Sequence, residues 1–344
     1  MTILTRRAFL KVAGVTGAAL ITGCQVPDDG SPAAAGGSSA GGASGAGLAP
    51  APVEILITPT GSLYIQSYSS RPTVQGESWN LNVHGLVERP RALTLADVRS
   101  FPKVEELRTL ECIGNPVGGS LIGNIVWGGF AAQALWDDVG ILPEATRARF
   151  EAEDDYSTSV EMKWIAQPGV LLVYEMNGEP LPTAHGYPLR ILMPGLYGQK
   201  MPKWIREIEF INYDHVGYWE SRGWSDVASV QTNSIIQQPR ELGGLPQGSV
   251  PVFGVAFAGL RRIARVDVRL DEGDWLAAEL IQAESPLTWT QWAFDWPADA
   301  GRHRIAVRAS DETGFVQSTE AESILSSSYP DGTDNIHSVV VSVG

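Results

Sequence analysis

The sequence predicts an α+β domain followed by an all-β domain. Up to about residue 215, apolar runs of strand length alternate with segments of helical spacing, such as 93–101 and 130–139. Beyond that point, strand-length segments follow one another at short intervals. Because 344 residues suffice for two domains with separate cores, we expect domains at 53–215 and 216–344.

The first 52 residues are expected to lie outside both domains. Within residues 1–23, Arg6 and Arg7 precede an apolar stretch at 12–21. This stretch is shorter than the roughly 20 residues that are needed to span a bilayer. The arginine pair with Phe-Leu-Lys after it resembles a twin-arginine signal, and an ordinary secretory signal is the alternative. We therefore expect export to the periplasm or to the cell-envelope face.

Cys24 follows Ile-Thr-Gly, which resembles the cleavage site of a bacterial lipoprotein. A lipid on Cys24 would anchor the protein without spanning the membrane, and it would be the protein's only membrane contact. Plain cleavage nearby, which leaves a soluble protein, is the alternative. Residues 24–52 predict a flexible linker, since from residue 30 on they are almost entirely Gly, Ala, Ser and Pro.

Strands and helices of the first domain are predicted from periodicity and from turn residues. Thr94 is the expected N-cap of the first helix, and Pro102 ends it. A loop rich in glycine follows the second strand. The predicted elements are strands at 79–87, 108–111, 170–174 and 189–193, helices at 93–101 and 130–139, and a loop at 114–129.

In the second domain, strands are predicted at 250–258, 263–270, 289–296 and 303–309. Residues 271–274 read Asp-Glu-Gly-Asp and favour a hairpin turn. Short strands at this spacing are typical of a β-sandwich.

Charge and missing motifs exclude several classes of function. The formal charge of −14 argues against nucleic acid as a partner, because phosphate binding needs a basic surface. The sequence has no Walker loop, no Gly-x-Gly-x-x-Gly and no His-Glu-x-x-His, which argues against a nucleotide-binding protein and a zinc hydrolase. It also lacks Cys-x-x-Cys-His, so we expect no haem in this chain.

Cys112 is the clearest candidate for a chemically reactive residue. Only two cysteines occur, and Cys112 stands where a strand enters the glycine-rich loop. Glycines allow a loop to approach a bulky ligand, and a soft thiolate suits a transition metal. The alternative is a buried, inert cysteine, and this window alone favours that alternative.

The wider sequence resembles the sulfite oxidase family of molybdopterin-dependent oxidoreductases. Thr-Leu-Glu-Cys-Ile-Gly-Asn, followed by Ile-Gly-Asn-x-x-Trp, is similar to the segment that supplies this family's cysteine ligand to molybdenum. Further segments follow in the family's order, and the resemblance extends from about residue 60 to the end. These segments are 83–90, 93–98, 174–190 and 194–204, with 259–280, 289–296 and 307–311 similar to the family's immunoglobulin-like dimerisation domain.

The resemblance implies a molybdenum ion held by a pyranopterin dithiolene, with Cys112 as the protein's ligand to the metal. Asp154 matches an acid that contacts the pterin, and His185 and Arg190 match residues that hold the pterin and its phosphate. Lys203 and Lys200 are expected to be further cofactor contacts. Arg and Lys suit a phosphate. The alternatives are a surface loop for His185 and Arg190 and a solvated charge for Lys203.

Departures from the family pattern concern the substrate side. Gln66 stands at the position of a substrate-binding arginine, and Pro116 and Val117 replace two further arginines. Trp224 replaces the active-site tyrosine. Tyr68 replaces a histidine. A pocket without these cations holds a dianion poorly, so we expect the metal site to be kept and the substrate to be changed.

These observations predict a small-molecule oxidoreductase that acts outside the cytoplasm and moves an oxygen atom and two electrons. Cys112, Trp224 and Gln66 are expected to line its catalytic side. Electrons would pass to or from a separate carrier, either a cytochrome or a quinone-linked protein, and the second domain would form a homodimer. A sulfite dehydrogenase and a non-catalytic cell-surface binding module are the alternatives.

Overall fold

The computed structural model describes residues 49, 51–52, 54–240, 244–282, 284–320 and 328–344. The predicted export signal, Cys24 and most of the predicted linker therefore lie outside the described residues. In the described part of the chain, no helix is both long enough and apolar enough to cross a membrane.

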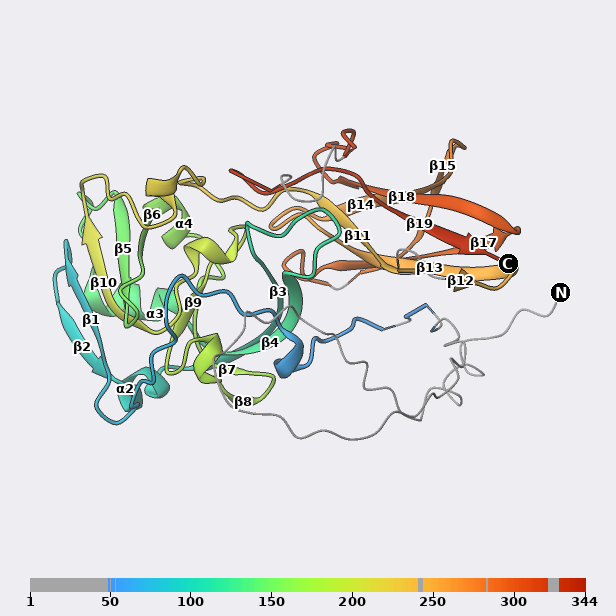
Figure 1. Ribbon diagram of the computed structural model, residues 1–344. Coiled ribbons are helices and arrows are strands. Elements are labelled where there is room, and N and C mark those ends of the chain that lie inside the picture. Colours follow the sequence, from blue (N-terminus) through green and yellow to red (C-terminus); the bar gives the residue numbers. More distant parts are fainter. Residues whose placement is uncertain (1–48, 50, 53, 241–243, 283, 321–327) are drawn as a thin grey trace, which may run out of the picture. The chain divides into compact units, whose positions relative to one another are not determined.

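The first domain contains two sheets in the part of the chain that is described (Figure 1). One has the order β2 (Arg91–Thr94), β1 (Asn80–Gly85), β10 (Ile205–Ile211), β5 (Arg147–Ala152) and β6 (Ser157–Glu161), with β1 and β10 parallel. The other has the order β3 (Lys103–Glu111), β4 (Ile122–Ala131), β7 (Leu171–Met176) and β8 (Glu179–Pro180), and β9 (Arg190–Leu192) pairs with β7.

Helices of this domain are short: α2 (Leu95–Ser100), α3 (Ala132–Val139), α4 (Met162–Ile165) and the 3₁₀ turns η1 (Thr60–Ser62), η2 (Thr183–His185), η3 (Gly198–Lys200) and η4 (Glu220–Arg222). The predicted α+β domain is confirmed, although strands outnumber helices in it. Alternating residues of β1, Leu81 and Val83, are fully buried, and Leu135 and Val139 of α3 join the same core.

The predicted N-cap of α2 is confirmed. Thr94 Oγ1 accepts a hydrogen bond from the Asp97 N–H at 3.2 Å, and Asp97 Oδ2 accepts one from the Thr94 N–H at 2.9 Å. This reciprocal capping box fixes the start of the helix. The helix ends at Ser100, because the residue before Pro102 is driven out of the helical region.

The predicted glycine-rich loop at 114–129 is wrong in its second half, which belongs to β4. Glycine serves close packing there: a Cβ on Gly129 would stand 2.1 Å from the carbonyl oxygen of Leu172, and one on Gly123 would stand 2.4 Å from Cδ1 of Leu63. Composition indicated a loop because it does not report how closely a neighbouring strand approaches. The preceding strand, β3, also starts earlier than predicted, at Lys103.

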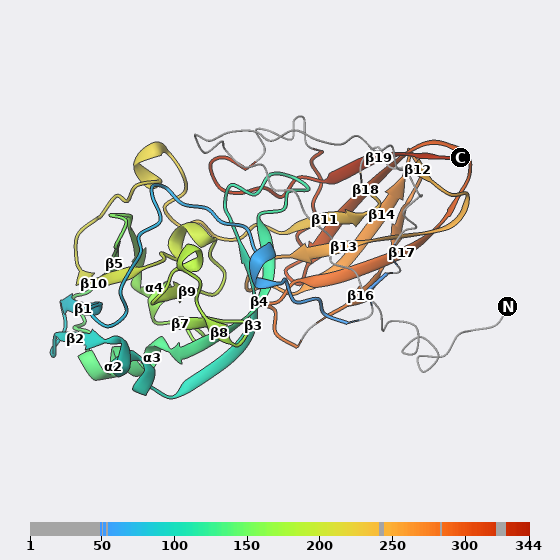
Figure 2. The same ribbon diagram turned by 60° about the horizontal axis from the view of Figure 1, so that its bottom comes forward.

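The second domain is a sandwich of two sheets, and Figure 2 shows its strands from a second direction. One sheet has the order β11 (Asn233–Gln238), β13 (Gly248–Phe257), β17 (Thr290–Ala298) and β16 (Glu279–Ile281). The other has the order β12 (Gly244–Leu245), β19 (His337–Val343), β18 (Gly301–Asp311), β14 (Ile263–Leu270) and β15 (Trp275–Ala277). The four predicted strands are confirmed as β13, β14, β17 and β18, and the turn at 271–274 joins β14 to β15.

The end of β3 contacts the second domain directly. The Thr109 N–H donates to the Leu287 carbonyl at 2.8 Å, and Thr288 Oγ1 donates to the Leu107 carbonyl at 2.9 Å. Asn233 of β11 donates its amide hydrogens to the Glu111 carboxylate, at 3.0 Å for Oε2. The strand that leads to Cys112 is thus held from both domains.

Candidate active site

A cavity of about 270 Å³ lies beside the end of β3. Its volume is close to the lower limit of small-molecule sites, which are about 300–1,000 Å³. It brings together all but one of the residues that the sequence predicted for the site: Gln66, Cys112, Asp154, His185, Arg190, Lys203 and Trp224. The backbone segments that supply them are far apart in sequence, so only the fold joins them.

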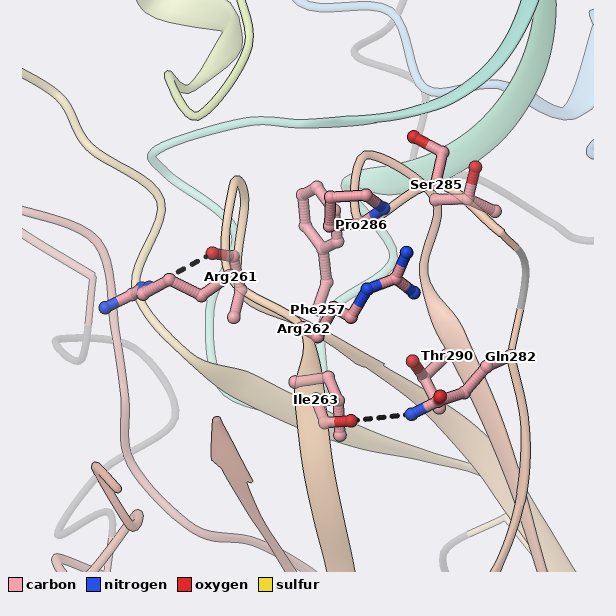
Figure 3. Close-up of a pocket in the computed structure, with 10 residues that line it drawn as sticks. Phe257, Arg261, Arg262, Ile263, Gln282, Ser285, Pro286 and Thr290 are labelled. Atoms are coloured by element: carbon pink, nitrogen blue, oxygen red, sulfur yellow. Dashed lines mark hydrogen bonds between the residues drawn. The ribbon is translucent and has the colours of Figure 1, made fainter. Parts of the chain in front are cut away.

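A second hollow lies in the sandwich domain and is shown in Figure 3. Arg261, Gln282 and Thr290 are among its lining residues, and Gln282 Nε2 donates to the Ile263 carbonyl at 2.6 Å. Its volume is about 10 Å³, which holds about one water molecule. It is too small for a cofactor, so we place the candidate active site at the larger cavity.

Cys112 is the first residue of a loop that is closed by hydrogen bonds. Its N–H donates to the Leu121 carbonyl at 2.9 Å, and its own carbonyl accepts from the Asn115 N–H at 2.9 Å. Burial raises the pKa of the Cys112 thiol to about 11. The free thiol is therefore protonated at neutral pH, and a bound metal cation is what would convert it to a thiolate.

Glu111, which the sequence did not single out, fixes the start of this loop. Its buried carboxylate accepts hydrogen bonds from the side-chain amides of Asn115, at 2.9 Å, and Asn233, at 3.0 Å. Burial raises the pKa of Glu111 to about 7. Since Asn233 belongs to the second domain, the position of Cys112 depends on both domains.

Arg190 and His185 are two buried residues that line the cavity together. Arg190 begins β9, and its Nη1 donates to the His185 carbonyl at 3.2 Å. Arg190 Nε is buried and has no hydrogen-bond partner among the described residues. Burial lowers the pKa of Arg190 to about 10. Burial, followed by the charges of Arg190 and Lys203, lowers the pKa of His185 to about 4.

Lys203 also lines the cavity and binds backbone carbonyls of two other segments. Its Nζ donates to the carbonyls of Gln66, at 2.7 Å, and Ala184, at 3.1 Å. Burial, together with the charge of Arg190, lowers the pKa of Lys203 to about 7. Cations crowded in this way repel one another, and an anion placed among them would be strongly favoured.

Asp154 is a half-buried member of the same wall. Its Oδ1 accepts a hydrogen bond from the Tyr156 N–H at 3.2 Å. Burial raises the pKa of Asp154, whereas the nearby Lys203 lowers it. The position of Asp154 on the cavity wall is compatible with the pterin contact predicted for it.

Lys200 is the predicted cofactor residue that does not line the cavity. It is fully buried, and its Nζ forms an ion pair with Glu220 and lies 3.3 Å from Asp226 Oδ1. A cofactor phosphate is therefore not its partner in this fold. Lys200 is the last residue of η3 and contacts β6, whereas Lys203 contacts Gln66 and Ala184.

The side of the cavity next to Cys112 is aromatic. A Cβ on Gly114 would stand 3.8 Å from the Trp224 ring and 3.7 Å from Cys112 Sγ, so Trp224 faces the cysteine loop. The ring centroids of Trp219 and Trp224 are 6.3 Å apart. The sequence did not predict the rings of Tyr64, Tyr156, Trp204 and Trp219, which also line the cavity. No local signal marked them, because their contacts depend on long-range folding.

Among the arginines of the described residues, Arg190 lines the cavity, whereas Arg71 and Arg222 do not. The Arg222 guanidinium lies 3.5 Å from the Tyr218 ring centroid, and its Nη1 donates to the Tyr218 carbonyl at 2.8 Å. Arg71 is exposed, and its charge contributes to the lowered pKa values of His185 and Lys203.

Comparisons with known proteins agree with this geometry. Residues 68–219 match the family described as oxidoreductase molybdopterin binding domain, and residues 225–328 match the Mo-co oxidoreductase dimerisation domain. Sulfite oxidase of Gallus gallus is 30% identical over 320 residues, covering 77% of this chain and 70% of that protein. Nitrate reductase [NADH] 1 of Oryza sativa subsp. japonica is 30% identical over 328 residues, covering 76% of this chain but only 36% of that protein.

A solved structure shares the fold over most of the chain. The sulfane dehydrogenase SoxCD from Paracoccus pantotrophus superposes with a TM-score of 0.72 and 25% identity, covering 84% of this chain and 83% of that chain. The immunoglobulin-like sandwich predicted for the second domain is thereby confirmed.

The site fits the cofactor that these similarities imply, a molybdenum ion on molybdopterin. The unpartnered Arg190 Nε and the neighbouring charge of Lys203 suit an anionic, phosphate-bearing group. The Cys112 thiol in the same cavity suits the metal. From its site, its fold and its relatives, the chain belongs to the sulfite oxidase family of molybdopterin-dependent oxidoreductases.

Proposed function

We propose that the protein transfers an oxygen atom and two electrons to or from a small substrate that is neutral or weakly charged. The observation that carries this proposal is that the rings of Tyr68, Trp219 and Trp224 line the same cavity as Cys112, with Trp224 next to the cysteine loop. Aromatic faces bind apolar and polarisable groups well, whereas they offer a dianion no compensation for its lost hydration.

The two sides of the cavity divide the work between cofactor and substrate. His185, Arg190 and Lys203 would hold the pterin and its phosphate, and Cys112 would bind the metal. When bound, the cofactor supplies the metal that exchanges the oxygen atom and stores the two electrons. The protein's residues orient the cofactor and exclude water, and Trp224 limits how a substrate reaches the metal.

Dimethyl sulfoxide is a suitable first probe, because it is a pyramidal sulfur compound like sulfite but carries no charge. Its reduction consumes two electrons and two protons and releases dimethyl sulfide and water. We expect turnover with a reduced viologen dye as electron donor, or the reverse reaction with ferricyanide. Activity on sulfite that far exceeds activity on both neutral compounds would contradict the proposed substrate class.

The purified protein is expected to hold about one molybdenum per chain when it is produced in cells that make the cofactor. The reason is the joint presence of a thiol ligand and an anion-binding side in one cavity. Elemental analysis and a fluorescence assay for the released pterin measure this directly. Protein that is folded but free of both molybdenum and pterin would support the non-catalytic binding module instead.

We further propose that the protein is exported by the twin-arginine route and anchored by a lipid on Cys24. Support comes from the sequence alone, because these residues are outside the described part of the chain. An exported oxidoreductase without haem needs a separate electron carrier, a cytochrome or a quinone-linked protein. The match to a dimerisation domain supports a homodimer formed through the second domain.

Replacing Arg6 and Arg7 by lysine is expected to keep the protein inside the cell. The substitution preserves the charge of the segment, so a general secretory signal would still function, whereas recognition of a twin-arginine pair would fail. Fractionation and immunoblotting of the cell envelope measure the outcome. Export at the unchanged level would identify the ordinary secretory route.

A further inference from the structure

The segment 217–226 carries two of the rings that face the substrate, Trp219 and Trp224. It connects β10 to β11 and contains the single turn η4. Most of its residues are exposed or half-buried, but Trp224 packs against a cluster of buried hydrophobic residues that includes Ile113 and Tyr197. Buried polar contacts add to this packing and hold the segment against the first domain.

Lys200 forms the first contact that holds this segment. Its side chain is completely buried, and its Nζ donates to Thr158 Oγ1 at 3.2 Å, to the Ser159 carbonyl at 3.1 Å and to Glu220 Oε1. The Glu220 side chain is itself only 5% exposed and also accepts from Thr158 Oγ1 at 2.7 Å. The pair therefore joins η4 to β6 in a site that excludes water.

Two further contacts hold the segment on either side of Trp224. Arg147 Nη2 donates to both carboxylate oxygens of Asp226, at 2.8 and 3.0 Å. At the other end, a Cβ on Gly217 would stand 2.6 Å from the Ser157 carbonyl oxygen, so the backbone lies directly on β6. Glu220 and Asp226 thus restrain the chain before and after Trp224.

The outer face of the segment gives a looser contact. The Trp224 and Tyr329 ring centroids are 5.1 Å apart, but Tyr329 is 55% exposed. A ring at the protein surface restrains its neighbour less than a buried ion pair does. The inner ion pair therefore restrains the segment more firmly than the ring contact with Tyr329 does.

We propose that Lys200 and Glu220 are positioning residues that set the aromatic substrate wall. Lys200 is also adjacent to Gln199, a cavity residue whose Nε2 donates to the Ser225 carbonyl at 3.0 Å. One buried ammonium thus links two parts of the cavity wall. The proposal depends on the proposed function only in its substrate readout, because the position of the rings is measured without turnover.

The test compares Lys200→Met, Glu220→Met and the double variant, with Lys163→Met as matched control. Lys163 also pairs with a glutamate, Glu161, but its side chain is 59% exposed. Each protein is labelled with 5-fluorotryptophan, and single Trp→Phe changes assign the ¹⁹F resonances of Trp219 and Trp224 among the 11 tryptophans. Molybdenum content, melting temperature and the KM for dimethyl sulfoxide are measured in parallel.

We expect both single variants to move the Trp219 and Trp224 resonances more than the other nine, to raise KM at least tenfold and to leave the molybdenum content unchanged. A single variant leaves an uncompensated buried charge and is less stable, whereas the double variant removes both charges and regains stability. The two resonances and KM should remain altered in the double variant, because the geometry is still lost.

Two results would overturn the proposal. In the first, a folded Lys200→Met protein keeps both resonances in place. In the second, the double variant recovers the resonances together with its melting temperature, which would mean that the pair only balances charge. If the wild-type protein does not turn over dimethyl sulfoxide, the proposed substrate class fails while the resonances still decide the positioning role.

Discussion

Replacing Cys112 by serine is expected to abolish turnover while the fold survives. A hydroxyl is a harder ligand than a thiolate, and its oxygen would leave the metal with a different charge and redox behaviour. Changes to groups that merely support a metal ligand cost about 10–100-fold, so losing the ligand itself should cost more than about 100-fold. Serine is only slightly smaller than cysteine, and the hydrogen bonds that residue 112 forms with Leu121 and Asn115 use its backbone atoms.

Steady-state turnover, circular dichroism and the visible absorption of the oxidised protein measure this prediction. The thiolate contribution to the absorption should disappear, which is a readout that does not require substrate. Cys24→Ser is the matched control, because it changes the only other cysteine and should leave turnover unaffected. Full activity in Cys112→Ser would mean that Cys112 is only a packed core residue.

Sulfite is expected to be a poor substrate, with a catalytic efficiency several decades below the diffusional range of about 10⁸–10⁹ M⁻¹s⁻¹. Three arginines that the family pattern places near the substrate are Gln66, Pro116 and Val117 here. Each lost charge-assisted hydrogen bond costs roughly 1.5–3 kcal/mol, or about one to two decades in transition-state binding. Arg71 and Arg222 do not replace them at the cavity wall.

Gln66→Arg should regain part of this loss, because Gln66 lines the cavity. We expect the efficiency with sulfite to rise by about one to two decades, which corresponds to one charge-assisted bond. Gln75→Arg adds the same charge at an exposed position outside the cavity and serves as the control. Wild-type efficiency near the diffusional range would refute both the assignment of Gln66 and the proposed substrate class.

Local sequence determined several parts of the structure by itself. The capping box at Thr94, the alternation of β1 and the strands β13, β14, β17 and β18 were predicted from residue patterns within each segment. The ordered motifs around Cys112, His185, Arg190 and Lys203 predicted a shared site, and all four residues line one cavity. These motifs carry their information in residue type and spacing.

Tertiary structure alone decided the partners of buried charges and the packing of glycines. Lys200 pairs with Glu220, a residue in a different element, and Glu111 binds Asn233 from the second domain. Gly129 lies in β4, and a glycine stands there because the Leu172 carbonyl of β7 leaves no room for a side chain. No local pattern reports such contacts, because a charge's partner and a glycine's neighbour are set by strand order and register between distant segments. The same reason applies to the substrate wall, where Tyr68, Trp219 and Trp224 meet only after folding.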